Sequence, residues 1–392
     1  PLPLALLFGG VLFGTLLGAL PGLGSILALT VCLPFTLMLD HIPAFALMLG
    51  TYVGALYGGS ITFILINVPG TPQAAATQLD GYPMALAGKA DVALGWVTIS
   101  AVTGGIFSCF VLAAAAAPLA YLSNQYAGPL EICALIAMGL TCIVTLSEGN
   151  LVKGLFSGLF GVILSCVGMD SISSELRFTF GFASAASGID MLPFVVGLFP
   201  LSEVLHRIYE IYTLPEYVVI KCNKIRFPSL RDWFAQKWIT VRSAVIGTII
   251  GILPGTGASP AAFISYSVAR ESSKHPEEFG KGCVEGVIAP EASHNAVTGG
   301  AMVPTLALGI PGDAETTLIL ATLTIHQITP GVRLMMDNPV MVHSVFFLLL
   351  LAYFMLSVAA IIMVRSFGRL IRLPNAVLLG LIVIFSMLGA FI

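Results

Sequence analysis

Long apolar runs separated by short polar segments dominate the pattern of the chain. Residues 92–117, 340–364 and 374–392 contain no Asp, Glu, Lys or Arg. Each run is close to or above the roughly 20 apolar residues that a helix needs to cross a bilayer. A transmembrane β-barrel would instead show alternating segments of about ten residues. The pattern therefore predicts an all-α polytopic membrane protein.

A long polar stretch divides this pattern into two halves. We predict a first membrane repeat with its following spans over residues 1–205, a cytoplasmic basic connector over 206–242, and a second membrane repeat over 243–392. Trp233 and Trp238, near the end of the connector, suggest a helix at the level of the lipid headgroups. Spanning or broken segments are expected near residues 2–39, 42–87, 92–117, 129–147, 151–169, 190–205, 243–269, 285–329, 340–364 and 374–392.

The two halves share sequence patterns in the same order. "GTLLGALPGLGS" (Gly14–Ser25) matches "GTIIGILPGTGAS" (Gly247–Ser259), with an offset of 233 residues. "GGSITFILINVPG" (Gly58–Gly70) matches "GGAMVPTLALGIPG" (Gly299–Gly312), with an offset of 241 to 242 residues. Two ordered matches at a nearly constant offset indicate the duplicated half that is typical of secondary transporters.

Each matched stretch places Pro and Gly in the middle of an apolar segment. Proline removes a backbone donor and clashes with the preceding helical turn, and irregular backbone at membrane depth is tolerated only where protein buries it or where it lines a cavity. Free N–H groups at helix starts favour anions, and free carbonyls can hold a small cation. We therefore predict broken helices and re-entrant hairpins, with arms of about ten residues or roughly 15 Å, whose tips meet at mid-membrane to form a substrate site.

The basic residues predict which loops face the cytoplasm. Residues 206–242 contain seven Lys or Arg, and short loops rich in these residues stay on the cytoplasmic side. If the segment 243–269 turns back at its break, the basic residues that follow it also stay inside. The count then places loop 330–338 outside and its counterpart 80–91 inside, so the two repeats are expected to have inverted topology.

The residues at the breaks are mostly glycine, proline and small polar residues. Glycine lets the backbone approach a ligand closely, although at a single break small residues could equally serve close helix packing. Four breaks in matched pairs favour a binding site. The candidate substrate-binding residues are Pro21, Gly22, Gly24, Ser25, Ser60, Asn67, Pro69, Gly70, Thr71, Gly255, Thr256, Gly257, Ser259, Thr305, Pro311 and Gly312.

Several ionisable and amide side chains fall within or beside the second set of apolar segments, notably in "APEASHNA" (Ala289–Ala296). Intramembrane ionisable residues are costly and usually functional, but an interfacial segment with these side chains in water is the alternative. Asp80 and Lys89 are expected to form a structural turn. The candidate ion-coupling residues are Asn67, Glu291, His294, Asn295, Asp313 and Glu315, with sodium held by oxygens or a proton held by Glu291, His294 or Glu315.

Composition excludes several other classes. With 9% charged residues and a net charge of −3, the chain has no basic stripe for nucleic acid. It contains no nucleotide-binding loop, zinc-protease motif or nucleophile elbow, so we expect no enzymatic activity and no cofactor apart from a coupling ion. The seven cysteines lie mostly inside apolar runs and are expected to be small buried hydrophobes.

These stretches resemble the large membrane subunit of tripartite tricarboxylate transporters, the TctA family. The resemblance is carried by "GTLLGALPGLGS", "YGGSITFILINVPGTPQAAATQLDGYPMALAGKA", "GTIIGILPGTGASPAAFISYSVAR" and "FGKGCVEGVIAPEASHNAVTGGAMVPTLALGIPGDAETTLILATLTIHQITPG". It implies a bacterial inner-membrane importer of carboxylates such as citrate. It also implies a small TctB-like membrane subunit, a periplasmic TctC-like substrate-binding protein, sodium coupling and an elevator-type movement.

The chain departs from the family pattern at two positions that bear on coupling. Members usually have two asparagines where this chain has His294 and Asn295, and more often an apolar residue where Glu315 stands. A proton could therefore replace or join sodium. The chain also stops short of the family's last hydrophobic segments, so we expect missing residues at both ends. A passive anion channel, which would need a continuous polar lining, is the main alternative function, and a membrane enzyme is a third.

Overall fold

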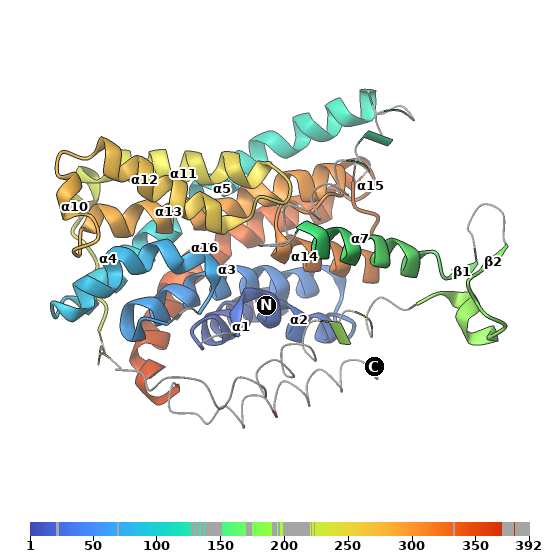
Figure 1. The fold of residues 1–392 in the computed structure, drawn as a ribbon, viewed down its shortest axis with the longest axis horizontal. Helices are drawn as coiled ribbons and strands as arrows, with labels where there is room; N and C mark the ends of the chain where they lie inside the picture. Colours follow the sequence, from blue (N-terminus) through green and yellow to red (C-terminus); the bar gives the residue numbers. More distant parts are fainter. Residues whose placement is uncertain are drawn as a thin grey trace.

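The computed structural model describes residues 1–20, 23–68, 70–126, 151–169, 175–189, 224–331 and 334–370, with single residues between these ranges. This part of the chain is almost entirely helical (Figure 1). Its only strands are β1 (Gly168–Met169) and β2 (Leu176–Arg177), an antiparallel pair in which Gly168 lies opposite Arg177. The spans predicted at 129–147, 190–205 and 374–392 lie almost wholly outside the described residues.

The helices follow the predicted apolar segments and split each broken segment in two. The first half contains α1 (Leu2–Gly18), α2 (Gly24–Thr36), α3 (His41–Ile66), the 3-10 turn η1 (Pro72–Ala74), α4 (Ala75–Leu86), α5 (Ala90–Tyr126), α7 (Leu151–Ser165) and η2 (Ala183–Ser187). The second contains α10 (Leu230–Ala235), α11 (Lys237–Ile252), α12 (Ala258–Ser272), η4 (Pro276–Glu278), α13 (Val284–Leu308), α14 (Ala314–Ile325), α15 (Leu334–Asp337) and α16 (Pro339–Leu370).

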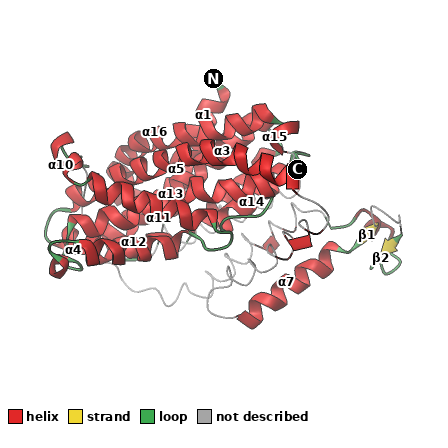
Figure 2. Cartoon of the chain, turned by 90° about the horizontal axis from the view of Figure 1, so that it is seen from above, coloured by secondary structure: helices red, strands yellow, loops and turns green. Residues whose placement is uncertain are grey.

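Three of the described helices are long and apolar enough to cross a membrane. The qualifying segments lie in α3, α5 and α16, and shorter apolar helices include α1, α2 and α14. Helix α3 lies at the centre, because the most apolar part of it is completely buried. In both views the long helices form one body, from which α7 and the β1–β2 pair project (Figures 1 and 2). The prediction of a multi-pass helical membrane protein is confirmed.

Helices α1 and α3 pack with their backbones in contact. Gly10, Gly14 and Gly18 recur every four residues and so lie on one face of α1. A Cβ atom on Gly14 would overlap with the backbone of Thr51, and one on Gly18 with the backbone of Ala55. The facing glycines of α3, which are Gly50, Gly54 and Gly58, meet α1 in the same way. Small residues at this spacing allow apolar helices to associate by close packing.

The second half repeats this close contact between its first and third helices. A Cβ atom on Gly247 of α11 would overlap with the backbone of Ser293 in α13, and Gly251, one turn later, meets Val297. On the other side of α13, Gly104 of α5 lies equally close to the backbone of Ala292. The pair α11–α13 therefore corresponds to α1–α3, as the sequence repeat predicts.

The backbone at the breaks repeats at the same offsets as the sequence. Gly24 and Gly257 both have a φ angle of 73° at the start of the second helix of each half. The third helix of each half ends in a left-handed residue, with φ of 59° at Asn67 and 72° at Gly309. Helices α4 and α14 both contain 12 residues. The internal duplication thus extends to local geometry.

The third helices of the two halves run in opposite directions. Ser60, late in α3, contacts Glu291, which is near the start of α13. Tyr52, about two turns earlier in α3, contacts Asp313, which follows the end of α13. The end of the second-half hairpin lies at the start of the first-half one. His326, which follows α14, is beside His41 at the start of α3, with 3.1 Å between their Nδ1 atoms.

The arms of the break at residues 253–257 are longer than predicted. Helix α11 has 16 residues and α12 has 15, which correspond to roughly 24 and 22 Å rather than 15 Å. The difference arises because α11 begins at Lys237, inside the predicted connector, and α12 continues to Ser272. Trp238 is 74% exposed at the start of α11, as expected for a headgroup-level side chain.

The α1–α3 contact can be tested with two glycines of α1. Gly14→Leu should force the helices apart and lower stability by about 1–3 kcal/mol or more, because over-packing displaces the backbone. Gly9→Leu, in the same helix, should change little, since nothing lies within 4 Å of a Cβ atom at Gly9. The melting temperatures of both variants in detergent would be compared by size-exclusion chromatography after heating. Equal melting temperatures would contradict the close contact.

Candidate functional site

Breaks within each half lie against one another. In the second half, the backbone N–H of Gly255 donates to the carbonyl of Gly312 at 2.9 Å. In the first half, a Cβ atom on Gly70 would overlap with the carbonyl of Gly18, and Gly24 lies next to the carbonyl of Gly70. Glycine is needed at Gly70 and Gly312 because a side chain would displace a neighbouring helix.

Glu315 joins the breaks of one half to those of the other. Its Oε1 atom accepts hydrogen bonds from the hydroxyl of Ser25 at 2.5 Å and from the amide of Gln73 at 2.7 Å. Ser25 lies in the first turn of α2, Gln73 lies in η1, and Glu315 lies in the first turn of α14. Only 2% of Glu315 is exposed. The break before α2, the break after α3 and the break between α13 and α14 therefore converge on one buried carboxyl group.

Asp313 makes a second connection between the halves. It caps the N-terminus of α14, where its Oδ1 atom accepts from the backbone N–H of Thr316 at 2.8 Å. Its Oδ2 atom accepts a hydrogen bond from the hydroxyl of Tyr52 on α3. Next to it, the hydroxyl of Thr305 accepts from the N–H of Gly312 at 3.3 Å. The break between α13 and α14 is thus held by its own side chains and by the opposite half.

Glu291 makes a third connection, farther along α13. Its Oε1 atom accepts from the hydroxyls of Ser60 and Thr77, the latter at 2.8 Å. Asn295, one turn later, donates to the Glu291 carbonyl at 3.0 Å, and His294 Nε2 lies 3.7 Å from Glu291 Oε2. All of these side chains are fully buried, so the alternative of an interfacial segment in water is wrong.

The three carboxyl groups share one chemical feature. Their hydrogen-bond donors are hydroxyls, amides and backbone N–H groups, and no Lys or Arg in the described part of the chain pairs with Glu291, Asp313 or Glu315. A buried carboxylate is costly unless a positive charge or a proton compensates it. This arrangement can therefore hold a proton or a small cation, as the sequence predicts for ion-coupling residues.

Oxygen atoms without hydrogen-bond partners lie among these groups. Within the described residues, Thr71 Oγ1, Gln73 Oε1 and Asn295 Oδ1 are buried without one. Buried polar atoms normally find a partner, so unpaired oxygens mark places where an ion, a water molecule or a ligand could bind.

Most predicted site residues lie in or beside this buried network. The structure places there Gly24, Ser25, Ser60, Gly70, Thr71, Gly255, Thr305, Gly312, Glu291, His294, Asn295, Asp313 and Glu315.

Several predicted residues are not connected to the network. Asn67 is exposed and accepts from Gln78 at 2.6 Å. The hydroxyl of Thr256 donates to the carbonyl of Ile250 at 2.6 Å and so caps the C-terminal end of α11. For the described residues Gly257, Ser259 and Pro311, which are half-buried, no hydrogen bond to the network is present. Pro21, Gly22 and Pro69 lie outside the described residues.

The sequence prediction missed three donors. Tyr52, Gln73 and Thr77 were not among the candidate residues, although each binds one of the buried carboxyl groups. Gln73 and Thr77 are four residues apart, and Asp80 follows three residues later, so the three share one helical face. This polar stripe after an apolar run was the available signal.

Asp80 connects the halves at a different place. Its Oδ1 atom accepts from the backbone N–H groups of Gly280, Gly282 and Cys283 at 2.9, 2.8 and 2.7 Å. Its Oδ2 atom accepts from the Tyr266 hydroxyl at 2.8 Å. The structural role predicted for Asp80 agrees with these contacts, but the residue lies within α4 and not in a turn. The turn comes at residues 87–89.

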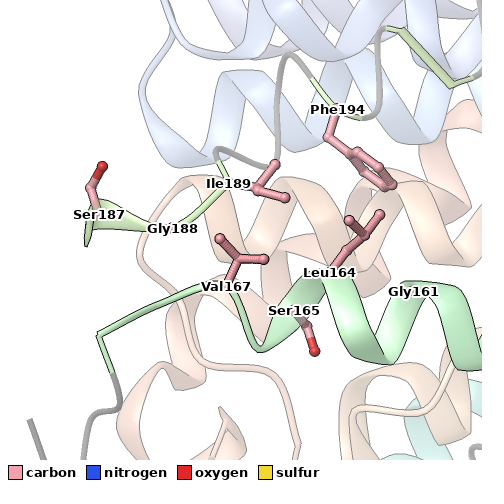
Figure 3. A pocket seen from close by; sticks show the side chains of 8 residues that line it. All are labelled: Gly161, Leu164, Ser165, Val167, Ser187, Gly188, Ile189 and Phe194. Carbon is pink, nitrogen blue, oxygen red and sulfur yellow. The ribbon is translucent and has the colours of Figure 1, made fainter. Parts of the chain in front are cut away.

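A separate hollow lies beside α7, away from the breaks. It has a volume of about 350 Å³, and its lining includes Leu164, Val167, Ile189 and Phe194 (Figure 3). None of its lining residues is charged, and none is a predicted site residue. It is therefore distinct from the predicted substrate site at the breaks.

The fold and the buried network define a multi-pass helical membrane protein with paired broken helices that meet at a polar centre. The chain belongs to the Tripartite tricarboxylate transporter TctA family, whose pattern matches residues 4–392.

Two relatives from Agrobacterium vitis are similar to the chain. One, described as an uncharacterized 52.8 kDa protein in the TAR-I ttuC' 3' region, is 33% identical over 391 residues, which cover 100% of this chain and 77% of the relative. The other, an uncharacterized protein in the TAR-II ttuC' 3' region, is 32% identical over 145 residues, which cover 37% of this chain and 60% of the relative. No solved structure matches the chain.

The Asp80 contacts can be tested by a single substitution. Asp80→Asn should destabilise the protein by roughly 3 kcal/mol, because it removes the charge that strengthens the hydrogen bonds from the loop N–H groups and turns an amide NH2 toward the Tyr266 hydroxyl, which loses its acceptor. Glu278→Gln changes an exposed carboxylate in the loop that Asp80 binds and should leave the melting temperature unchanged. If Asp80→Asn has the same melting temperature as the wild type, this carboxylate does not hold the two halves together.

Proposed function

We propose that the chain is the large transmembrane subunit of a secondary transporter that imports tricarboxylates or related carboxylates, such as citrate, driven by an ion gradient and dependent on a binding protein. Membership of the TctA family supports the class. The meeting of three breaks at the buried Glu315, which two donors of the opposite half contact, is the single observation that carries the proposal. The partners are a small TctB-like membrane subunit and a periplasmic TctC-like binding protein.

Burial of the site favours alternating access over a passive anion channel. At the centre of the site, no more than 2% of Ser25, Glu291 or Glu315 is exposed. A channel needs a continuous polar path, whereas an alternating-access transporter encloses its site and opens it by moving one part against another. We propose that this movement is of the elevator type.

The substrate site is proposed to bind anions without a buried arginine. N–H groups at the start of α2 attract anions, and the buried hydroxyl groups of Ser25, Thr71 and Thr305 are further candidate donors. The absence of Lys and Arg from the described breaks supports this view. Asn67 and Ser259 remain predicted contributors that would have to approach the substrate during the movement.

Entry of a carboxylate needs cations to accompany it. An inside-negative potential opposes each negative charge by roughly 2.3 kcal/mol per 100 mV. Sodium could use the unpaired oxygens of Thr71, Gln73 and Asn295, and a proton could use Glu291 or Glu315. We propose sodium as the main coupling ion with the proton as a possible co-driver, in the inner membrane of a bacterium.

Uptake into proteoliposomes tests this function. The protein, with its small membrane subunit and its binding protein, should accumulate radiolabelled citrate when a sodium gradient points inward. Omission of the binding protein or of the gradient should reduce uptake to the background level. Uptake that follows a proton gradient alone would remove sodium from the proposal, and rapid passive flux without any gradient would indicate a channel.

The opposite directions of α3 and α13 support an inverted relationship between the two repeats. Labelling from the two sides of the membrane tests this relationship. In a variant without native cysteines, Lys89→Cys should react with an impermeant maleimide only from the cytoplasm. Asp337→Cys should react only from outside, since both positions are exposed at corresponding places of the two halves. Reaction of both from the same side would rule out an inverted relationship.

A further inference from the structure

We propose that Glu315 is an internal carboxylate that occupies the position of a substrate carboxyl group when no substrate is bound, and that its protonation releases the site. This inference rests on the proposed function and deepens it. It makes Glu315 the group that links proton binding to substrate binding, and it makes Ser25 and Gln73 the donors for which substrate and Glu315 compete.

The geometry around Glu315 is that of a bound carboxylate. One oxygen, Oε1, accepts both a hydroxyl hydrogen bond from Ser25 at 2.5 Å and an amide hydrogen bond from Gln73 at 2.7 Å. Both donors come from the first half, and the carboxyl group comes from the second. Ser25 also lies in the first turn of the 13-residue helix α2, where the helix dipole favours negative charge. These are the features that would recognise the carboxylate of a transported anion.

A polar atom without a hydrogen-bond partner on one of these donors points to a ligand. Thr71 Oγ1 and Gln73 Oε1 are buried and without a hydrogen-bond partner among the described residues. Thr71 is fully buried, and 8% of Gln73 is exposed. Thr71 Oγ1 lies against Gly59 of α3, whereas Gln73 Oε1 belongs to the amide that binds Glu315. A donor site built only for Glu315 would not leave this amide oxygen unpaired. A larger ligand, or a ligand with its own hydroxyl groups, could engage it once Glu315 moves aside.

Charge makes Glu315 and an anionic substrate mutually exclusive. The ionisable groups that interact with Glu315 are Asp313, at the start of the same helix, and Tyr52 on α3. Neither supplies positive charge, and no described Lys, Arg or His pairs with Glu315. A second carboxylate beside an ionised Glu315 would be repelled in a buried site of low dielectric. A protonated Glu315 is a weaker acceptor, because hydrogen bonds to charged groups are roughly twice as strong as those between neutral groups.

Proton binding and substrate binding should therefore favour each other. Substrate binds the form with protonated Glu315, so affinity is high at low pH and falls as rising pH ionises this group. By reciprocity, substrate raises the affinity of Glu315 for its proton. Each substrate molecule would then bind together with one proton, which Glu315 takes up. A variant without this carboxyl group would bind substrate without that proton.

Citrate binding to the purified full-length chain in lipid nanodiscs tests the inference. At pH 8, Glu315→Gln should bind citrate about tenfold more tightly than the wild type, because a neutral amide of the same size no longer repels the anion. Between pH 6 and pH 8.5, wild-type affinity should fall more steeply than that of Glu315→Gln. The charge state of citrate itself is common to both proteins, so the difference reports on Glu315.

Two further variants complete the test. Glu278→Gln, in an exposed loop, should bind citrate like the wild type. Ser25→Ala in the Glu315→Gln background should lose the gain in affinity, because it removes a donor from the freed site. The melting temperature of each variant establishes that it is folded.

Affinity of Glu315→Gln that is equal to or weaker than that of the wild type would overturn the inference. Weaker binding would show that Glu315 supplies a ligand to a coupling cation instead. If Glu315→Gln did not fold, wild-type affinity that is independent of pH over this range would contradict the inference by itself. A wild type that binds no citrate at any pH and takes up none with its partners would overturn the proposed function, and this inference with it.

Discussion

Carboxyl groups buried between helices must find their donors within the protein, and this constraint determines how the two halves meet. Glu291, Asp313 and Glu315 belong to the second half, and the side chains that bind them across the interface belong to the first. At one end of this interface Asp80 reverses the pattern, because a first-half carboxyl group accepts from second-half N–H groups. Hydrogen bonds between the halves are therefore concentrated at carboxyl groups, whose protonation state can alter the contact.

Close helix contacts make this arrangement possible. The glycines of α1 and α3 bring two backbones together without intervening side chains, and α11 and α13 do the same with Gly247 and Gly251. Apolar lipid gives no hydrophobic advantage to such pairs, so close packing has to supply the association. Each half thereby becomes a firm unit that holds its two breaks in contact. Movement is therefore not expected within these helix pairs.

The sequence predicts the helices, the breaks and the duplication well, because each has a local signal. Long apolar runs fix the spans, and the Pro/Gly stretches fix the breaks to within a few residues, as at Gly24 and Gly257. The pairing of Ser25 with Glu315 was not predictable, because it joins residues 290 positions apart. Tyr52 was missed since a tyrosine in an apolar helix has no local mark of a polar role. Asn67 lies apart from the buried network, because its left-handed conformation ends a helix and its side chain accepts from Gln78.

A cryo-electron microscopy map of the protein in nanodiscs with citrate would test the central claim, that a carboxylate substrate binds where the broken helices meet. Citrate density within hydrogen-bond distance of Ser25 and Gln73, with the Glu315 side chain moved away from both, is the predicted result. Citrate bound elsewhere, for example beside the basic residues before α11 or in the hollow next to α7, with Glu315 still bonded to Ser25, would contradict it.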